Sequence, residues 1–414
     1  MGEEGTRAVP VTDAEPSSAP LDPQRYLPSG DEAGTAPEDR SFRPDVEGLR
    51  AVAIVLVILV HAGVPHMQGG TVGVDAFFVI SGFVITGLLL REHLATGGIG
   101  FLHFYARRAR RILPMAILVI VVVLVAIDLL ATHGDTVSAA SDGRWSALFL
   151  GNVHFTAVDP NVLVPRQSPF GQYWSLADEE QFYLVYPAFF ALLLALPGKW
   201  SLTRRLALGL SGVVVASFAA SVTTSGVGQL GAYYSPFTRA WELAIGGLVA
   251  IGTPYLKSIP IAAAAIMSWI GLVGLVVAAD IISVRTPYPG YAAALPVASV
   301  ALIISAGAAA PPRGAEVLLG SLPFRWIGRW SYSWYLWHLA IIVIAAEYGH
   351  ELYGSLSITL RLGLAALALV VAAGSYFAIE NPIRHSKRIA QSPGATLVGS
   401  ALLVGTCVAF TFAF

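Results

Sequence analysis

The chain has 414 residues, of which 55% are hydrophobic and only 12% are Asp, Glu, Lys or Arg. A soluble globular protein carries about 25% charged residues, so this composition excludes an ordinary soluble domain. The formal net charge of -1 gives no indication of nucleic-acid binding. The single cysteine, Cys407, excludes an internal disulfide framework, a multi-cysteine metal site and a CxxC redox site.

The segment from Met1 to Ser41 differs in composition from the rest of the chain. It is rich in Pro, Ala, Gly, Ser, Asp and Glu and holds little that could be buried. We therefore expect residues 1–41 to form a disordered cytoplasmic tail. The tail lacks the apolar core of a signal peptide, so the first apolar run, which begins near Leu49, is expected to remain as a membrane span.

Apolar runs of about 17–22 residues recur along almost all of the remaining chain, and each is long enough to cross a hydrocarbon core. The sequence therefore predicts an all-α polytopic membrane helix bundle with about ten core spans and one final span. The predicted spans are 49–64, 72–90, 112–131, 174–196, 206–224, 239–252, 260–280, 291–309, 333–348, 357–379 and 395–414.

The distribution of basic residues orients this bundle. With the N terminus in the cytoplasm, the arginines of residues 107–111 lie inside, as do the later loops with Lys199, Lys257 and Arg384. This arrangement requires that Trp145–Val158 does not cross, so we expect a re-entrant or surface segment there. The chain is then predicted to be a multi-pass protein of the plasma membrane, surrounded by lipid, with its C terminus outside.

Ionisable side chains inside a membrane span are costly and are therefore candidates for function. In the first span, Arg50 and His61 lie about 20° apart around the helix and about 16 Å apart along it. Separately, Arg50 could be an interfacial anchor and His61 a packing residue. Asp75 opens the second span at about the depth of His61. It could favour the helix dipole, or it could orient His61 as the carboxylate of a catalytic dyad does.

Four arginines lie together just before the third predicted span. Arg107 and Arg110 are three residues apart, as are Arg108 and Arg111, so either pair could share one side of a helix. Guanidinium groups suit phosphate oxygens, but such a cluster also anchors a span at the cytoplasmic face. The spacing leaves both interpretations open and does not choose between the pairs.

Four further ionisable residues are candidates for the acceptor side of a site. Glu179 and Glu180 enter the fourth predicted span from the outer end, where they could bind acceptor hydroxyls or pair with buried arginines. Glu242 and His338 fall inside predicted helices, among aromatic residues of the kind that form interfacial belts. The sequence indicates no metal site.

Seven motifs, taken in this order, resemble the acyltransferase-3 family of membrane acyltransferases. The resemblance covers nearly everything from Phe42 to Arg384, and the full series is far more specific than any one motif. The motifs occupy residues 42–61, 73–83, 104–114, 174–183, 235–243, 331–338 and 380–384.

The resemblance implies a transmembrane acyltransferase domain over residues 42–388. Members of this family transfer an acyl group, often acetyl, from acyl-coenzyme A to a hydroxyl, commonly on a bacterial surface carbohydrate, although some acylate small molecules such as macrolides. The resemblance also implies functional roles for Arg50, His61 and an RxxR pair. By motif position this pair is Arg108 with Arg111, and Arg107 with Arg110 has the same spacing. Residues 389–414 resemble an additional final helix that leads, in some members, to an outer SGNH-type domain. Alternatively, this helix only completes the bundle.

These observations combine into a mechanistic hypothesis. The coenzyme A phosphates would bind Arg108, Arg111 and Arg50 at the inner face, and the thioester would reach His61 near the outer face. His61 would act as general base, with Asp75 fixing its tautomer, or it would carry the acyl group covalently. A transporter without chemistry and a structural partner of a polysaccharide synthase are the alternatives. The sequence does not predict an oligomeric state.

Overall fold

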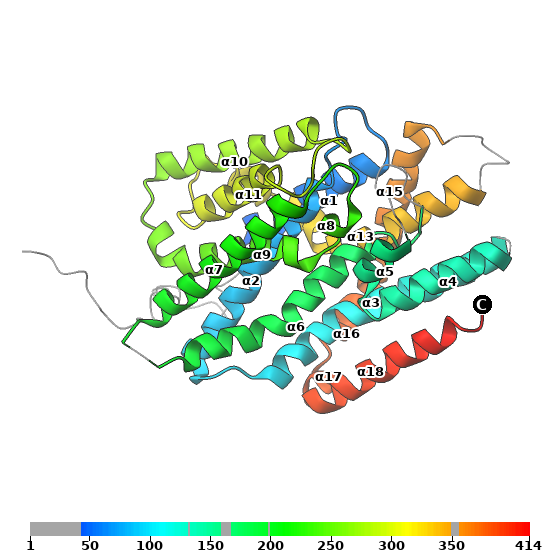
Figure 1. Cartoon of the computed structure of the whole chain (residues 1–414), viewed down its shortest axis with the longest axis horizontal. Helices are drawn as coiled ribbons and strands as arrows, with labels where there is room; N and C mark the ends of the chain where they lie inside the picture. Colours follow the sequence, from blue (N-terminus) through cyan, green and yellow to red (C-terminus); the bar gives the residue numbers. More distant parts are fainter. Residues whose placement is uncertain (1–42, 131–132, 159–166, 198, 349–355) are drawn as a thin grey trace, which may run out of the picture.

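A computed structural model describes residues 43–130, 133–158, 167–197, 199–348 and 356–414, so the predicted tail of residues 1–41 lies outside the described residues. All regular structure in these ranges is helical. Most of the long helices run in one general direction across Figure 1, with α10 along one edge and α18 along the opposite edge. The helices are α1 (Pro44–His61), α2 (Val72–Thr96), α3 (Phe101–Leu130), α4 (His133–Ala147), α5 (Gly151–Val158), α6 (Tyr173–Ala195), α7 (Leu202–Thr224), α8 (Leu230–Tyr233), α9 (Pro236–Leu256), α10 (Ile261–Ile281), α11 (Ala294–Gly307), α12 (Glu316–Leu319), α13 (Leu322–Tyr348), α15 (Ile358–Ser375), the π-helix η2 (Tyr376–Glu380), α16 (Asn381–Arg384), α17 (Lys387–Ala390) and α18 (Pro393–Phe410).

Six helical segments among the described residues are long and apolar enough to cross a membrane. They are α2, α3, α7, α10, the continuous segment Ile358–Arg384 and α18. Helices α1, α6, α9 and α13 are also at least 18 residues long, but they carry most of the ionisable candidates. The all-α class is therefore confirmed, whereas the predicted total of about eleven spans is not, and the orientation stays a prediction.

Residues 145–158 do not form one continuous helix. α4 ends at Ala147, α5 begins at Gly151, and Phe149 between them has a φ of 54°. Asn152 of α5 donates a 2.7 Å hydrogen bond to Asp178 of α6. The segment thus contains the end of α4, a break, and α5, which is held against α6. Helices α4 and α5, of 15 and 8 residues, are each shorter than a membrane span requires.

The close contact of α1 with α13 positions the candidate site. Gly328 of α13 lies against the backbone of α1, where an added Cβ would overlap the carbonyl oxygen of Glu47. One turn further along, Arg50 donates to the Ser331 hydroxyl over 3.0 and 3.1 Å. The two helices therefore run side by side in the same direction, and this brings the C-terminal end of α1 to the middle of α13.

Helices α2 and α9 approach each other through glycines. A Cβ added at Gly82 would overlap the carbonyl oxygen of Leu243, and one added at Gly246 would overlap that of Val79. Small residues allow backbones to pack this closely in membrane helices. The contact matters because α2 carries Asp75 and α9 carries Arg239 and Glu242.

Replacing Gly246 by Ala is expected to lower the free energy of unfolding by about 1–3 kcal/mol, because the methyl group must push α9 away from α2. Thermal unfolding in detergent measures the change. Gly212→Ala is the matched control, since nothing lies within 4 Å of an added Cβ there, and alanine is otherwise the better helix former. Equal unfolding temperatures for the two variants would contradict the packing.

Candidate functional site

His61 and His338 form a hydrogen-bonded pair where α1 meets α13. His61 Nδ1 lies 3.1 Å from His338 Nε2, and the ring centroids are 5.1 Å apart. His338 is fully buried, whereas His61 lines a cavity. The sequence predicted both residues as candidates, but it did not predict that they touch.

The backbone of α13 determines which ring nitrogens carry protons. His338 Nδ1 lies 2.7 Å from the Tyr335 carbonyl oxygen and 3.2 Å from that of Trp334. A carbonyl oxygen only accepts, so this nitrogen carries the hydrogen and Nε2 of the neutral ring is an acceptor. His61 Nδ1 must then donate to His338, and a lone pair remains on His61 Nε2. His61 thus has the tautomer that a general base requires.

His61 lines a cavity of about 340 Å³, which we name the histidine cavity. Its wall combines aromatic rings with hydrogen-bonding side chains, a surface suited to a ligand that is partly apolar and rich in hydroxyl groups. The polar and aromatic lining residues are His61, Thr71, Phe155, Gln167, Ser168, Gln172, Trp174, Tyr233, Tyr234, Tyr335 and Arg361.

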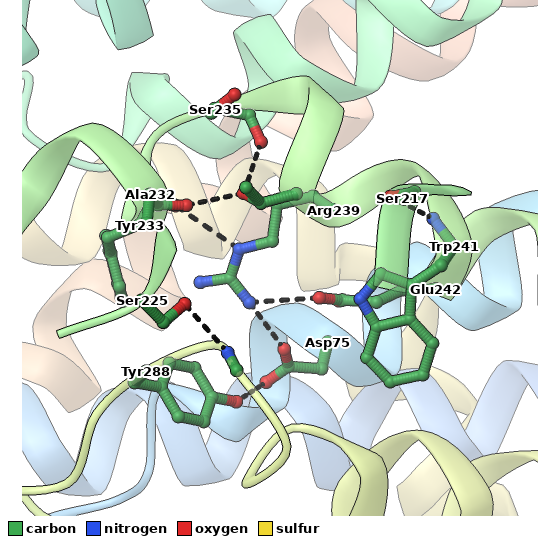
Figure 2. A network of polar contacts seen from close by, with 12 residues as sticks. Asp75, Ser217, Ser225, Ala232, Tyr233, Ser235, Arg239, Trp241, Glu242 and Tyr288 are labelled. Atoms are coloured by element: carbon green, nitrogen blue, oxygen red, sulfur yellow. Dashed lines mark hydrogen bonds and ion pairs between the residues drawn. The ribbon is translucent and has the colours of Figure 1, made fainter. Parts of the chain in front are cut away.

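The predicted contact of Asp75 with His61 is wrong. Arg239 Nη1 donates to Asp75 Oδ1 over 2.8 Å, and the Tyr288 hydroxyl donates to Asp75 Oδ2 (Figure 2). No hydrogen bond joins Asp75 to His61 in the described part of the chain. The physical reason is burial, because a fully buried carboxylate needs a cation and hydrogen bonds to compensate its lost hydration, and Arg239 supplies them.

Glu242 belongs to the same network, and it does not line the histidine cavity. Its Oε1 accepts a 3.0 Å hydrogen bond from Arg239 Nη1, and Figure 2 shows the same nitrogen of Arg239 joined to both carboxylates. The guanidinium also lies 5.5 Å from the ring centroid of Trp174 and 4.9 Å from that of Tyr233. Both rings line the histidine cavity, so the buried network supports the aromatic part of the cavity wall. The i,i+3 spacing of Arg239 and Glu242 was the available sequence signal for this pairing.

A second cavity, of about 60 Å³, contains the predicted arginines, and we name it the arginine cavity. Arg50, Arg108 and Arg111 line it, together with Glu179. By this measure one water needs about 10–15 Å³, so the cavity holds a few waters but no nucleotide. Its full lining is Arg50, Val74, Phe77, Phe78, Ser81, Arg108, Arg111, Ile112, Ser175, Leu176, Glu179, Ser331, Tyr332 and Tyr335.

The two cavities adjoin. Val74 and Tyr335 line both of them. The Tyr335 hydroxyl lies 2.6 Å from Ser175 Oγ and donates to the Gln172 carbonyl over 3.1 Å, while the Phe77 ring packs edge-on against it at 6.2 Å. A fixed aromatic side chain therefore stands between the arginine cavity and the histidine cavity.

Helix α3 separates its four arginines onto different surfaces. Arg108 and Arg111 line the arginine cavity. Arg107 instead pairs with Glu92 at 2.9 Å, and Arg110 donates to the carbonyl oxygen of Ser386 at 3.5 Å. Of the two pairs with equal spacing, only Arg108 and Arg111 thus share a cavity.

Glu179 and Glu180 were predicted as candidates for binding an acceptor, but in the structure both lie near Arg108. Glu180 forms an ion pair with Arg108, and Glu179 lines the arginine cavity, where it accepts a 2.7 Å hydrogen bond from Ser81. Neither lines the histidine cavity. A guanidinium removed from water is stabilised by a counter-ion. Glu179 also lies 3.9 Å from Arg108, so the alternative that these carboxylates pair with buried arginines accounts for both.

Several residues of the site were not predicted from the sequence. Gln172 and Arg361 line the histidine cavity, and Ser331 holds Arg50. Arg361 is a lone basic residue in the first turn of an apolar helix, which was a usable signal because such a charge is costly beside a membrane. No group of three or more His, Cys, Asp or Glu side chains in the described ranges could hold a metal ion.

The chain is a helical, membrane-type bundle. It has a histidine pair beside one cavity and arginines beside the next, as expected of a membrane acyltransferase. The family described as "Acyltransferase domain", the acyltransferase-3 family, matches residues 43–380. The chain therefore belongs to this family of acyltransferases.

Two relatives illustrate the match. The chain is 29% identical over 357 residues to "Peptidoglycan O-acetyltransferase OatA" of Listeria monocytogenes, a region that covers 84% of this chain and 56% of OatA. It is 31% identical over 398 residues to "Putative membrane-bound transacylase BcsY" of Komagataeibacter xylinus, covering 89% of this chain and 90% of that protein. The chain thus spans little more than half the length of OatA. No solved structure gives a significant match.

Proposed function

We propose that this protein transfers an acyl group, acetyl in the first instance, from cytoplasmic acyl-CoA to a hydroxyl of an extracytoplasmic carbohydrate. Membership of the acyltransferase family and the relatives named as O-acetyltransferases support the reaction class. One observation carries the proposal. His61, with its tautomer set by His338, lines a cavity that adjoins the arginine cavity through Val74 and Tyr335.

In the proposed reaction, His61 Nε2 accepts the proton of the acceptor hydroxyl. The oxygen attacks the thioester carbonyl, a C–O bond forms, the C–S bond breaks, and the thiolate of coenzyme A takes the proton from His61. His338 Nε2 accepts the hydrogen bond from His61 Nδ1 throughout, which favours the imidazolium that forms in between. A covalent acyl-histidine is the second route.

Arg50 and Arg111 are the proposed phosphate ligands of the donor. Arg108 is already neutralised by Glu180. Arg50 donates to the neutral oxygens of Ser331 and Gly328 and lies 5.6 Å from the ring centroid of Phe77, without an ion pair to a described residue. Arg111 has no hydrogen bond or ion pair with any described residue. Because the arginine cavity is too small for a nucleotide, we expect the nucleotide to stay at its mouth while only the thin pantetheine arm passes Phe77 and Tyr335.

Arg111→Gln is expected to weaken coenzyme A binding at least about tenfold, because one charge-assisted hydrogen bond to phosphate is worth about 1.5–3 kcal/mol. Isothermal titration of the detergent-solubilised protein with coenzyme A measures the affinity. Arg107→Gln is the matched control on the same helix, since Arg107 lies outside the arginine cavity and pairs with Glu92. Equal affinities for both variants would remove the phosphate role from Arg111.

In this proposal the arginine cavity faces the cytoplasm, the histidine cavity faces outward, the N terminus is cytoplasmic and the C terminus is outside. Acylation of a small molecule such as a macrolide would use the same residues. A transporter would move its substrate without acylating it. Radiolabelled acetyl-CoA, offered with a panel of carbohydrate and macrolide acceptors to membranes that contain the protein, separates these functions, because only an acyltransferase produces labelled acceptor.

A further inference from the structure

Two buried polar atoms without a hydrogen-bond partner in the described part of the chain belong to side chains that line the histidine cavity. They are Oε1 of Gln172 and Nε of Arg361. Buried polar atoms without a hydrogen bond are rare, because each costs about 1–3 kcal/mol. Of the eleven such atoms among the described residues, these two belong to side chains that line the same cavity as His61, where a ligand can supply their partners.

The amide of Gln172 is fixed with its oxygen free. Nε2 donates a 2.8 Å hydrogen bond to the carbonyl oxygen of Leu336, which lies on α13 just before His338. The side chain is buried, and the amide oxygen is left as an acceptor without a donor. A hydroxyl group of a bound acceptor is the complementary group, and it would be held close to the helix that positions His61.

The guanidinium of Arg361 lies over the turn that follows His61. An ideal Cβ on Gly63 would be 3.3 Å from Arg361 Nη1, and Arg361 sits in the first turn of α15. The buried cations Arg108 and Arg239 each pair with a carboxylate. Arg361 is only half-buried, and no carboxylate among the described residues forms an ion pair with it.

We infer that the histidine cavity selects an acceptor carrying an oxyanion near the hydroxyl that is acylated, with the anion on Arg361 and the hydroxyl oriented by Gln172. A carboxylate of an acidic sugar and a phosphate of a sugar phosphate offer the same paired oxygens to a guanidinium. The aromatic wall accepts the sugar ring. This inference rests on the proposed function, and it narrows the acceptor from any carbohydrate to an anionic one.

Equilibrium binding separates the charge preference from the chemistry. The purified full chain in detergent is titrated by microscale thermophoresis with three probes: a glucose trisaccharide, a glucuronic acid trisaccharide and glucose 1-phosphate. We expect the wild type to bind at least one anionic probe about tenfold more tightly than the neutral trisaccharide, and Arg361→Gln to abolish that preference. Arg361→Lys should keep part of it, because the charge remains. Which anion is preferred distinguishes an acidic sugar from a sugar phosphate.

Arg285→Gln is the matched control, because Arg285 is an exposed arginine that does not line the cavity. This variant should still bind the anionic probe more tightly than the neutral one. The inference is overturned if the wild type binds none of the probes, if it prefers the neutral one, or if Arg361→Gln keeps the anion preference. Acetyl transfer from labelled acetyl-CoA is measured in parallel. An anion preference that depends on Arg361, without any transfer to the bound probe, would count against the proposed function and not against this binding site.

Discussion

We expect His61→Ala to reduce acyl transfer by at least about 100-fold, the lower end of what a positioned general base contributes. The physical reason is that His61 Nε2 is the free lone pair of the histidine pair, since its Nδ1 donates to His338. Transfer of label from acetyl-CoA to an acceptor, in membranes that contain equal amounts of folded protein, measures the loss. Unchanged coenzyme A binding by the same variant would place the defect in the chemistry.

His66→Ala is the control for this experiment, because its side chain is 87% exposed in the loop that follows α1, and full activity is expected. His338 is a positioning residue and gives a graded result. His338→Gln, whose amide oxygen can still accept from His61 Nδ1, should retain more of kcat than His338→Leu at equal thermal stability. If His61→Ala keeps normal activity, His61 is not the base. If the two His338 variants are equally active, His338 does not act through the hydrogen bond.

Arg239→Met is expected to lower the free energy of unfolding by about 3–5 kcal/mol, the usual cost of removing one partner from a buried ion pair. The substitution leaves two fully buried carboxylates, Asp75 and Glu242, without the cation that lies 2.8 and 3.0 Å from them. The aromatic wall of the histidine cavity also loses its support at Trp174 and Tyr233. Thermal and denaturant unfolding in detergent measure the change.

Neutralising the whole network tests the reason for this loss. Adding Asp75→Asn and Glu242→Gln to Arg239→Met should restore most of the stability, because no buried charge is then left unpaired. Arg204→Met, at an exposed arginine of α7, should unfold like the wild type. A triple variant no more stable than Arg239→Met would mean that shape, and not charge compensation, accounts for the cost.

The sequence determined the class of fold, and it located the charged residues that the fold had to accommodate. Each residue of an α-helix adds a rise of about 1.5 Å and a rotation of about 100°. The spacing of Arg50 and His61 alone therefore indicated that a cation and an imidazole share one side of a helix. The same local geometry showed that Arg108 could accompany Arg111. The motifs identified the family, which the match over residues 43–380 confirms.

The tertiary structure decided which charges are partners. Asp75 was predicted to contact His61 and instead pairs with Arg239. The hydrogen-bond partner of His61 is His338, which is far from it in the sequence. Glu180 compensates Arg108 and does not line the histidine cavity. Contacts between helices depend on which surfaces pack together, such as the approach of α1 to α13 at Gly328, and helix periodicity carries no information about that choice. Burial then favours charge compensation, and Arg108 and Arg239 pair with the carboxylates that packing brings within reach.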